Sequence, residues 1–318
     1  MEYRKLISFG KSSYVVSLPK PWIGQNKLKK GDLIYMEENG QNLMLSKSTV
    51  KDGEEEKTKV INIDGKSFPL IMREVNSGYI QNYRSIILKG KEIKDKVKEI
   101  QQIFQNLIAL EVMEQTSDSV VAKDFLNMDQ VSIEELIRKM DIIARTMLNE
   151  TISSISKDNY GNINERDKDV NRLYFLLYRA VLYNLEHLSN AMKKYKLGPA
   201  DLLNKHFIGF YIEGIADEAR RTARFIRQVK GGAKDKATLI SFLGKVEQHY
   251  INTMKAYYDK DVEYALKQSD SKALLNKELD VIDSKSQDLN FVTATSRIRR
   301  LISYVHSLGR LVYTSSNY

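Results

Sequence analysis

Basic side chains that could bind a polyanion concentrate in three stretches of this 318-residue chain. Residues 1–50 hold eight Lys/Arg against four Asp/Glu, residues 220–230 hold five basic residues and no acid, and residues 297–310 add four arginines. The net charge of the whole chain is +9, with a pI near 9.3. An excess of this size favours nucleic acid or an anionic membrane surface as a partner.

The residues that other chemistries need are missing or wrongly spaced. The absence of cysteine excludes disulfides, thiolate metal sites and cysteine nucleophiles. None of the four histidines has another at i+4 or lies in an HExxH context, and the chain holds no nucleophile elbow, P-loop or Gly-rich phosphate loop. The sequence therefore predicts a protein that is not an enzyme.

The hydropathy pattern predicts a cytoplasmic protein without membrane insertion. No apolar run approaches the roughly 20 residues that span a bilayer. The N-terminus leads into a strand pattern and not into the apolar region of a signal peptide.

Residues 1–47 predict a small β module that would carry the first basic stretch. Tyr14, Val16 and Leu18 alternate onto one face of a predicted strand. The Asn39-Gly40 pair suits a type I′ hairpin turn, and Pro21 suits the first turn of a short helix.

Residues 48–127 predict a linker followed by a small α/β segment. Residues 48–58 are polar and contain few apolar side chains. Apolar runs at 60–63 and 85–88 indicate strands, and residues 91–108 indicate a helix.

Residues 128–318 predict long helices that pack as bundles. Ser132 and Glu135 form a capping-box pattern at the start of the first helix. Helix breaks are expected near 159–162, 198–199, 231–232 and 269–271, with a further one at 283–288 left open. Five or six helices result, and antiparallel helices of this length bury their apolar stripes against one another.

The N-terminal block over residues 4–20, which continues through Trp22 and the turn at 28–32, resembles the AbrB/SpoVT/MazE family. The resemblance implies a swapped-hairpin barrel that dimerises and binds DNA. The basic and small polar positions that match, and that would contact DNA phosphates, are Arg4, Lys5, Lys11, Ser12, Ser13 and Lys20. The alternative is that these residues form only a solvated face on a dimerisation module.

The physics of a short β module supports dimerisation independently. A segment of this length cannot close its own core, and small isolated β structures need a partner. Gly10 would allow the tight turn that precedes Lys11.

Three segments of the helical part, residues 138–147, 167–179 and 212–219, resemble the PhoU family of phosphate-uptake regulators. The resemblance extends over most of residues 100–316 and implies two three-helix bundles. The order of an AbrB-like module followed by a PhoU-like region resembles archaeal fusion proteins.

The PhoU resemblance also implies a divalent or iron-type metal site at Glu213 and Asp217. Residues four apart share one helix face, so two carboxylates could bind one cation. The alternative is that both acids form salt bridges with Arg220 and Arg221. No cofactor is otherwise indicated, and in the last helix arginine and tyrosine stand at Arg300, Tyr304 and Arg310, where the family tends to have acids.

The basic face of residues 220–227 has two interpretations. Arg220, Arg221, Arg224 and Arg227 could be solvated or paired with acids of a neighbouring helix, or they could form a docking surface for an acidic partner or for DNA.

Together these features predict a mainly α protein with a small N-terminal β module. Its predicted function is that of a DNA-binding transcriptional regulator of phosphate uptake, a homodimer that senses a signal through its helical domain. The alternative function is an adaptor that does not bind DNA and that modulates a phosphate-transporter ATPase or another regulatory partner.

Overall fold

The computed structural model describes residues 3–39, 42–47, 57–230 and 232–315. The chain divides into two compact units, residues 1–55 and residues 56–318. Most of the predicted linker, residues 48–56, lies outside the described residues.

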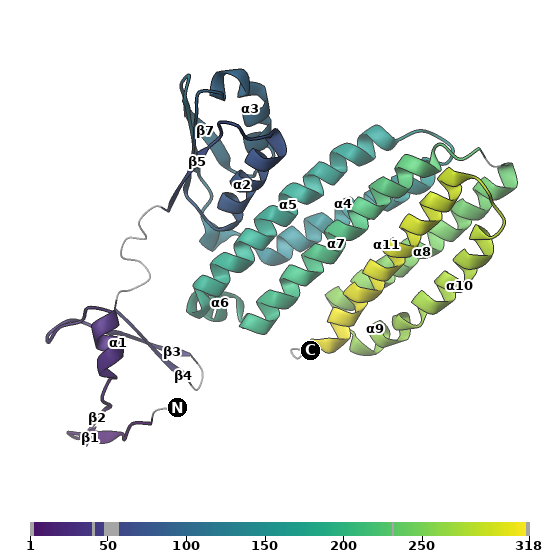
Figure 1. The fold of residues 1–318 in the computed structure, drawn as a ribbon. Coiled ribbons are helices and arrows are strands. Elements are labelled where there is room, and N and C mark those ends of the chain that lie inside the picture. The colour runs from purple at the N-terminus through teal and green to yellow at the C-terminus, as the bar shows by residue number, and fades with distance from the viewer. Residues whose placement is uncertain (1–2, 40–41, 48–56, 231, 316–318) are drawn as a thin grey trace. The chain divides into compact units, whose positions relative to one another are not determined.

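Two β-hairpins and one short helix make up the described part of the first unit (Figure 1). The elements are β1 (Ile7–Phe9), β2 (Ser13–Val15), α1 (Lys20–Gln25), β3 (Tyr35–Asn39) and β4 (Asn42–Ser46). Pro21 lies in the first turn of α1, as predicted. Gly40 of the predicted turn lies outside the described residues, between the paired Asn39 and Asn42.

The predicted swapped-hairpin barrel is not formed by the described residues. β1 pairs only with β2, and β3 only with β4, so that two separate two-stranded sheets result. Two unconnected hairpins leave their outer edges unpaired, and a barrel requires a continuous ladder of strands.

The second unit begins with a four-stranded sheet. Its elements are β5 (Thr58–Asn62), α2 (Phe68–Ile80), β6 (Ser85–Lys89), a 3₁₀ turn (Ile93–Asp95), α3 (Val97–Gln105), β7 (Leu110–Gln115), β8 (Ser119–Asp124) and a second 3₁₀ turn (Met128–Gln130). The strand order is β5-β6-β8-β7, in which β5 and β6 are parallel and the other two pairs antiparallel. Ile71 and Val75 of α2 and Phe104 of α3 share one buried cluster with the sheet.

The described residues after 130 form eight α-helices, more than the five or six predicted. They are α4 (Ile133–Ser153), α5 (Tyr160–Glu186), α6 (Leu188–Tyr195), α7 (Pro199–Ile226), α8 (Ala233–Asp259), α9 (Val262–Ser269), α10 (Ser271–Asp283) and α11 (Leu289–Thr314). Every predicted break is present, including the open one at 283–288. The two missed breaks follow Glu186 and Asp259, where neither glycine nor proline marks the end of a helix.

The helices pack as two neighbouring bundles (Figure 1). α4, α5 and α7 contact one another in the first, and α8 and α11 pack with α9 and α10 in the second. α7 also packs along α11, and one continuous cluster of buried apolar side chains runs through both bundles. The mainly helical, bundled architecture is therefore confirmed. Among the described residues, no helix is both long enough and apolar enough to cross a membrane.

A fully buried arginine joins the sheet to the helices within the second unit. Arg179 of α5 donates to the carboxylate of Asp124 at the end of β8 and to Asn82 Oδ1 at 2.9 Å. Its guanidinium carbon lies 4.6 Å from the ring centre of Tyr79, and Arg84 donates to the same Asp124 carboxylate. Burial raises the pKa of Tyr79 to about 12, so the phenol under the arginine stays neutral. The sheet and α5 are thus joined by charged hydrogen bonds of Arg179 as well as by the apolar contact of Phe175 with the sheet cluster.

Candidate functional site

The residues predicted to contact DNA are all exposed in the first unit. Lys11 and Ser12 lie in the turn between β1 and β2, and Gly10 has the positive φ of 72° that this turn requires. Ser13 begins β2, and its hydroxyl donates to the Phe9 carbonyl at 2.6 Å, which ties the two ends of the turn together. The structure therefore brings Lys11, Ser12 and Ser13 together in one turn.

The other three residues of this set lie on different parts of the first unit. Arg4 and Lys5 precede β1, and Lys20 is the first residue of α1. The structure therefore gathers only Lys11, Ser12 and Ser13 of the six predicted residues into one place.

The apolar side chains of the first unit are mostly exposed. Leu28 is the one buried apolar residue among the side chains that the structure describes in this unit. Tyr14 and Val16, which were expected to face a core, are 68% and 42% exposed. The large apolar side chains exposed on and beside the strands are Leu6, Ile7, Phe9, Tyr14, Val15, Val16, Leu33, Met36 and Leu43.

The two carboxylates of the predicted metal site lie on α7 in a network dominated by arginine. Asp217 accepts from Arg220 at 2.6 Å and from Arg221 at 2.8 Å. Arg220 Nε also lies 3.0 Å from the carboxylate of Asp167 on α5. Both oxygens of Asp217 are therefore engaged by guanidinium groups.

This set of residues does not fit a divalent cation. No group of three or more His, Asp or Glu side chains suited to a metal is present within the described ranges. Two arginines beside the carboxylates would repel a cation. Burial raises the pKa of Glu213 to about 7, and the negative charges of Asp217 and Asp167 add to the effect. The geometry matches the salt-bridged alternative for Asp217, whereas Glu213 forms no ion pair with the side chains that the structure describes.

The basic face of α7 is largely paired with acids. Arg227 donates to Asp158 at 2.7 Å and covers the ring of Tyr160. Arg221 also lies near Glu218, a side chain that is 1% exposed and that faces Arg300 of α11 at 3.2 Å. Pairing with an acid of a neighbouring helix, one of the predicted interpretations, is observed for Arg220, which reaches Asp167 on α5. Arg221 pairs instead with acids of α7 itself, and Arg227 pairs with Asp158 in the loop before α5. Glu218, which links α7 to α11, was missed because its partners follow it by about eighty residues.

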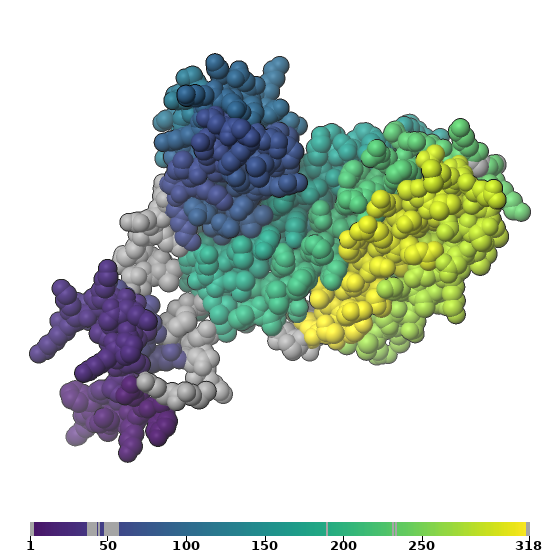
Figure 2. Space-filling view, viewed as in Figure 1, coloured from purple at the N-terminus to yellow at the C-terminus, as the bar shows by residue number. Residues whose placement is uncertain are grey.

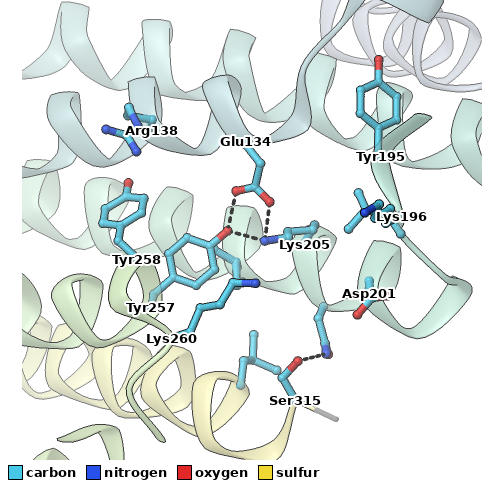
Figure 3. A pocket seen from close by; sticks show the side chains of 14 residues that line it. Glu134, Arg138, Tyr195, Lys196, Asp201, Lys205, Tyr257, Tyr258, Lys260 and Ser315 are labelled. Atoms are coloured by element: carbon cyan, nitrogen blue, oxygen red, sulfur yellow. Dashed lines mark hydrogen bonds and ion pairs between the residues drawn. The ribbon is translucent and has the colours of Figure 1, made fainter. Parts of the chain in front are cut away.

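A pocket of about 640 Å³ opens between the two bundles (Figure 3). Side chains from α4, α6, α7, α8 and α11 line it, together with residues that directly follow α6, α8 and α11. Lys205 lies at its centre, where its ammonium group contacts Glu134 Oε1 at 2.5 Å and Tyr257 Oη at 2.7 Å. Tyr257 Oη in turn donates to Glu134 Oε2 at 3.0 Å. The sequence did not indicate this pocket, since its lining comes from five separated segments.

Comparison with known proteins identifies the fold of the helical part. Neither a family model nor a curated protein matches the sequence. Among solved structures, the chain is similar to the crystal structure of PhoU from Pseudomonas aeruginosa, with 14% sequence identity and a TM-score of 0.50. The match covers 57% of this chain and 93% of that chain. The predicted PhoU-like fold of the helical region is thereby confirmed.

Proposed function

We propose that this protein is a regulatory adaptor without catalytic activity that takes part in the control of phosphate uptake through protein contacts. The observation that carries the proposal is the PhoU-like fold, which accounts for nearly the whole length of the matched chain. Fold alone does not determine function, so the proposal needs a surface through which the protein could act.

An exposed apolar stripe on α7 supplies such a surface. Leu203, Phe207 and Phe210 are 50%, 38% and 40% exposed, and their spacing places them on one face of the helix. Phe210 packs beside Tyr174 and Tyr211, which hold the ring in place. Exposed aromatic side chains that are held rigidly are typical anchors of protein interfaces.

The test uses the full chain and the ATPase subunit of the phosphate transporter from the same organism. Sedimentation velocity should show a complex at about 10 μM of each protein, in the affinity range of transient regulatory contacts. Phe207→Asp with Phe210→Asp should remove the complex. Leu274→Asp is the matched control, because Leu274 is 67% exposed on α10. Absence of a complex with the unmodified chain would overturn the proposed partner, and an unaffected double variant would overturn the proposed surface.

The first unit favours a second candidate function, in which a homodimer of the chain binds DNA. Its strands expose apolar side chains that a second copy would cover, and Lys5, Lys11 and Lys20 are exposed on its loops and at the start of α1. Strands of one copy would pair with the strand edges that the other copy leaves unpaired. Such a dimer would present two basic surfaces to the phosphate backbone.

A salt titration tests this second candidate. Binding of a fluorescent duplex from the promoter of the phosphate-transporter genes should weaken steeply with salt, and every phosphate that the protein ceases to neutralise should reduce the slope by about 0.9. Lys11→Ala with Lys20→Ala should reduce the slope. Lys29→Ala with Lys30→Ala removes the same charge from the same unit, and its salt dependence should stay steeper than that of the Lys11/Lys20 variant. If the duplex does not bind at low salt, DNA binding is excluded and the adaptor proposal is unaffected.

A further inference from the structure

The pocket between the bundles has an excess of positive charge. Four basic side chains line it, Arg138, Lys196, Lys205 and Lys260, against the acids Glu134 and Asp201. Four positive and two negative groups leave two positive charges. Within the described part of the chain, neither Arg138 nor Lys196 has an ion-pair partner, and the Arg138 guanidinium lies 5.1 Å from the centre of the Tyr258 ring. We propose that the pocket binds a small organic phosphate of about nucleotide size.

The dimensions of the pocket favour an organic ligand over inorganic phosphate. Its volume of about 640 Å³ lies within the roughly 300–1,000 Å³ typical of sites for small organic molecules. A water molecule occupies only about 30 Å³ of liquid, so a single tetrahedral anion would leave most of the space to solvent. An organic part of the ligand would fill it.

The pocket has an apolar wall for that organic part. Leu197, Ile208 and Leu311 line it together with the rings of Tyr195 and Tyr257. Figure 3 shows the labelled basic side chains distributed around these rings and not gathered on one side. A ligand with a phosphate group and an apolar or aromatic body would meet both kinds of surface at once.

The Lys205 ammonium group is held in position by its neighbours before a ligand binds. Its side chain is 17% exposed, and its ammonium group lies 4.7 Å from the centre of the Tyr257 ring. Glu134 and Tyr257 fix its position before any ligand arrives. Ordering a cation in advance lowers the entropy that binding must remove.

The backbone at two of the lysines provides an independent observation. Lys196 and Lys260 have φ angles of 54° and 55°, and each directly follows the last residue of a helix, α6 and α8 respectively. Glycine or asparagine usually occupies this left-handed position. Two separate helix ends thus carry a strained lysine, and both side chains line the same pocket. Strained residues that gather at one site are typical of binding sites.

Calorimetric titration of the full chain with ATP, adenosine, tripolyphosphate and inorganic phosphate tests the proposal. ATP should bind saturably below about 1 mM, more tightly than tripolyphosphate or inorganic phosphate, and adenosine should not bind. Lys196→Gly with Lys260→Gly should weaken ATP binding by at least about tenfold, since a hydrogen bond to a charged group is removed at each position. The same variant should unfold at the same or a higher urea concentration, because glycine relieves the backbone strain.

The control is Lys234→Ala with Lys255→Ala, which removes two charges from exposed positions of α8 outside the pocket and should leave ATP affinity within about twofold. Three results would overturn the proposal. They are no saturable binding of ATP, an ATP affinity that the double glycine variant leaves unchanged, and tripolyphosphate or inorganic phosphate binding as tightly as ATP. In the last case the organic part of the ligand would contribute nothing.

Discussion

The two units of this chain bury their apolar side chains very differently. In the second unit, two clusters of buried residues fill the sheet layer and both helical bundles. In the first unit, Leu28 alone is buried among the described side chains, and Phe9 and Leu33 are 68% and 74% exposed. In the space-filling view the purple side chains of the first unit project outward, whereas those of the helical bundles interlock (Figure 2).

From this contrast we expect the second unit to be complete as a single chain, whereas the first needs a further surface to cover its apolar side chains. Burial of apolar surface is the main force that stabilises a fold. A unit of about fifty residues that buries almost none of its apolar side chains lacks that force unless another surface covers it. The second unit should therefore unfold independently of protein concentration, and the first should not.

The largest expected effect lies at the charged contact inside the second unit. Arg179→Met should destabilise that unit by about 3–5 kcal/mol, because Asp124 would keep only the part-exposed Arg84 as a partner and Asn82 Oδ1 would lose its buried donor. Urea unfolding followed by far-ultraviolet circular dichroism, which reports the helices, measures the destabilisation at two protein concentrations. Arg84→Met is the control and should cost less, since the Arg84 side chain is 39% exposed and Arg179 still pairs with Asp124. A destabilisation that depends on protein concentration would contradict the view that this unit is complete.

The next effect tests whether the first unit needs a second copy. Trp22 is the single tryptophan of the chain and lies in α1, so its fluorescence reports the first unit alone. Phe9→Asp should weaken pairing by about 2–3 kcal/mol, the value of one buried aromatic side chain, and lower the midpoint of the Trp22 transition. Leu274→Asp, an exposed position of the second unit, should not change it. A Trp22 transition of the unmodified chain that does not depend on concentration would show that the first unit is stable without a partner.

The same contrast explains which parts of the fold could be predicted. The helix breaks at Gly198-Pro199 and Ser269–Ser271 were identified because local residue types determine where a helix ends. The break after Asp259 was missed because Lys260 adopts its left-handed conformation without being glycine. The pattern over residues 14–18 indicated a strand, but a local pattern does not contain the contacts that would cover its apolar side chains.

The candidate sites depend on contacts that local patterns do not contain. Arg179 and Asp124 are 55 positions apart, and Arg300 and Glu218 are on helices that meet only in the folded bundle. The spacing of Glu213 and Asp217 indicated a shared helix face correctly. Whether that face would hold a cation or arginines depended on Arg220 reaching Asp167 on α5.

A smaller effect probes how tightly the second unit is packed. A Cβ atom at Gly209 would lie 2.0 Å from Leu177 Cδ2, so Gly209→Ala should push α7 and α5 apart. The net destabilisation should be about 1–2 kcal/mol, after the gain in helix propensity offsets part of the overpacking. At Gly244 on α8 a Cβ would meet nothing within 4 Å, so Gly244→Ala should stabilise by up to about 1 kcal/mol. Equal effects of the two substitutions on urea unfolding would contradict the close packing of α5 and α7.

The smallest expected effect is a pH dependence confined to the second unit. The pKa of Glu213 is raised to about 7 in the folded chain, above its ordinary value near 4.5. Between pH 4.5 and pH 7 the Glu213 carboxyl is ionised in the unfolded chain but protonated in the folded chain. The free energy of unfolding therefore falls as the pH rises through this window. Glu213→Gln should remove this fall. It should stabilise the helices by about 1 kcal/mol at pH 8, allowing for solvent screening, and by nothing at pH 4.

Urea unfolding at both pH values, read by circular dichroism for the helices and by Trp22 fluorescence for the first unit, measures this effect. Glu263→Gln is the control, because the Glu263 side chain is 80% exposed on α9. Its stability difference from the unmodified chain should be the same at pH 4 and pH 8. A stabilisation by Glu213→Gln that is equal at the two pH values would show that the carboxyl is ionised alike in both states. A shift of the Trp22 transition would show instead that the two units unfold together, because Glu213 belongs to the second unit alone.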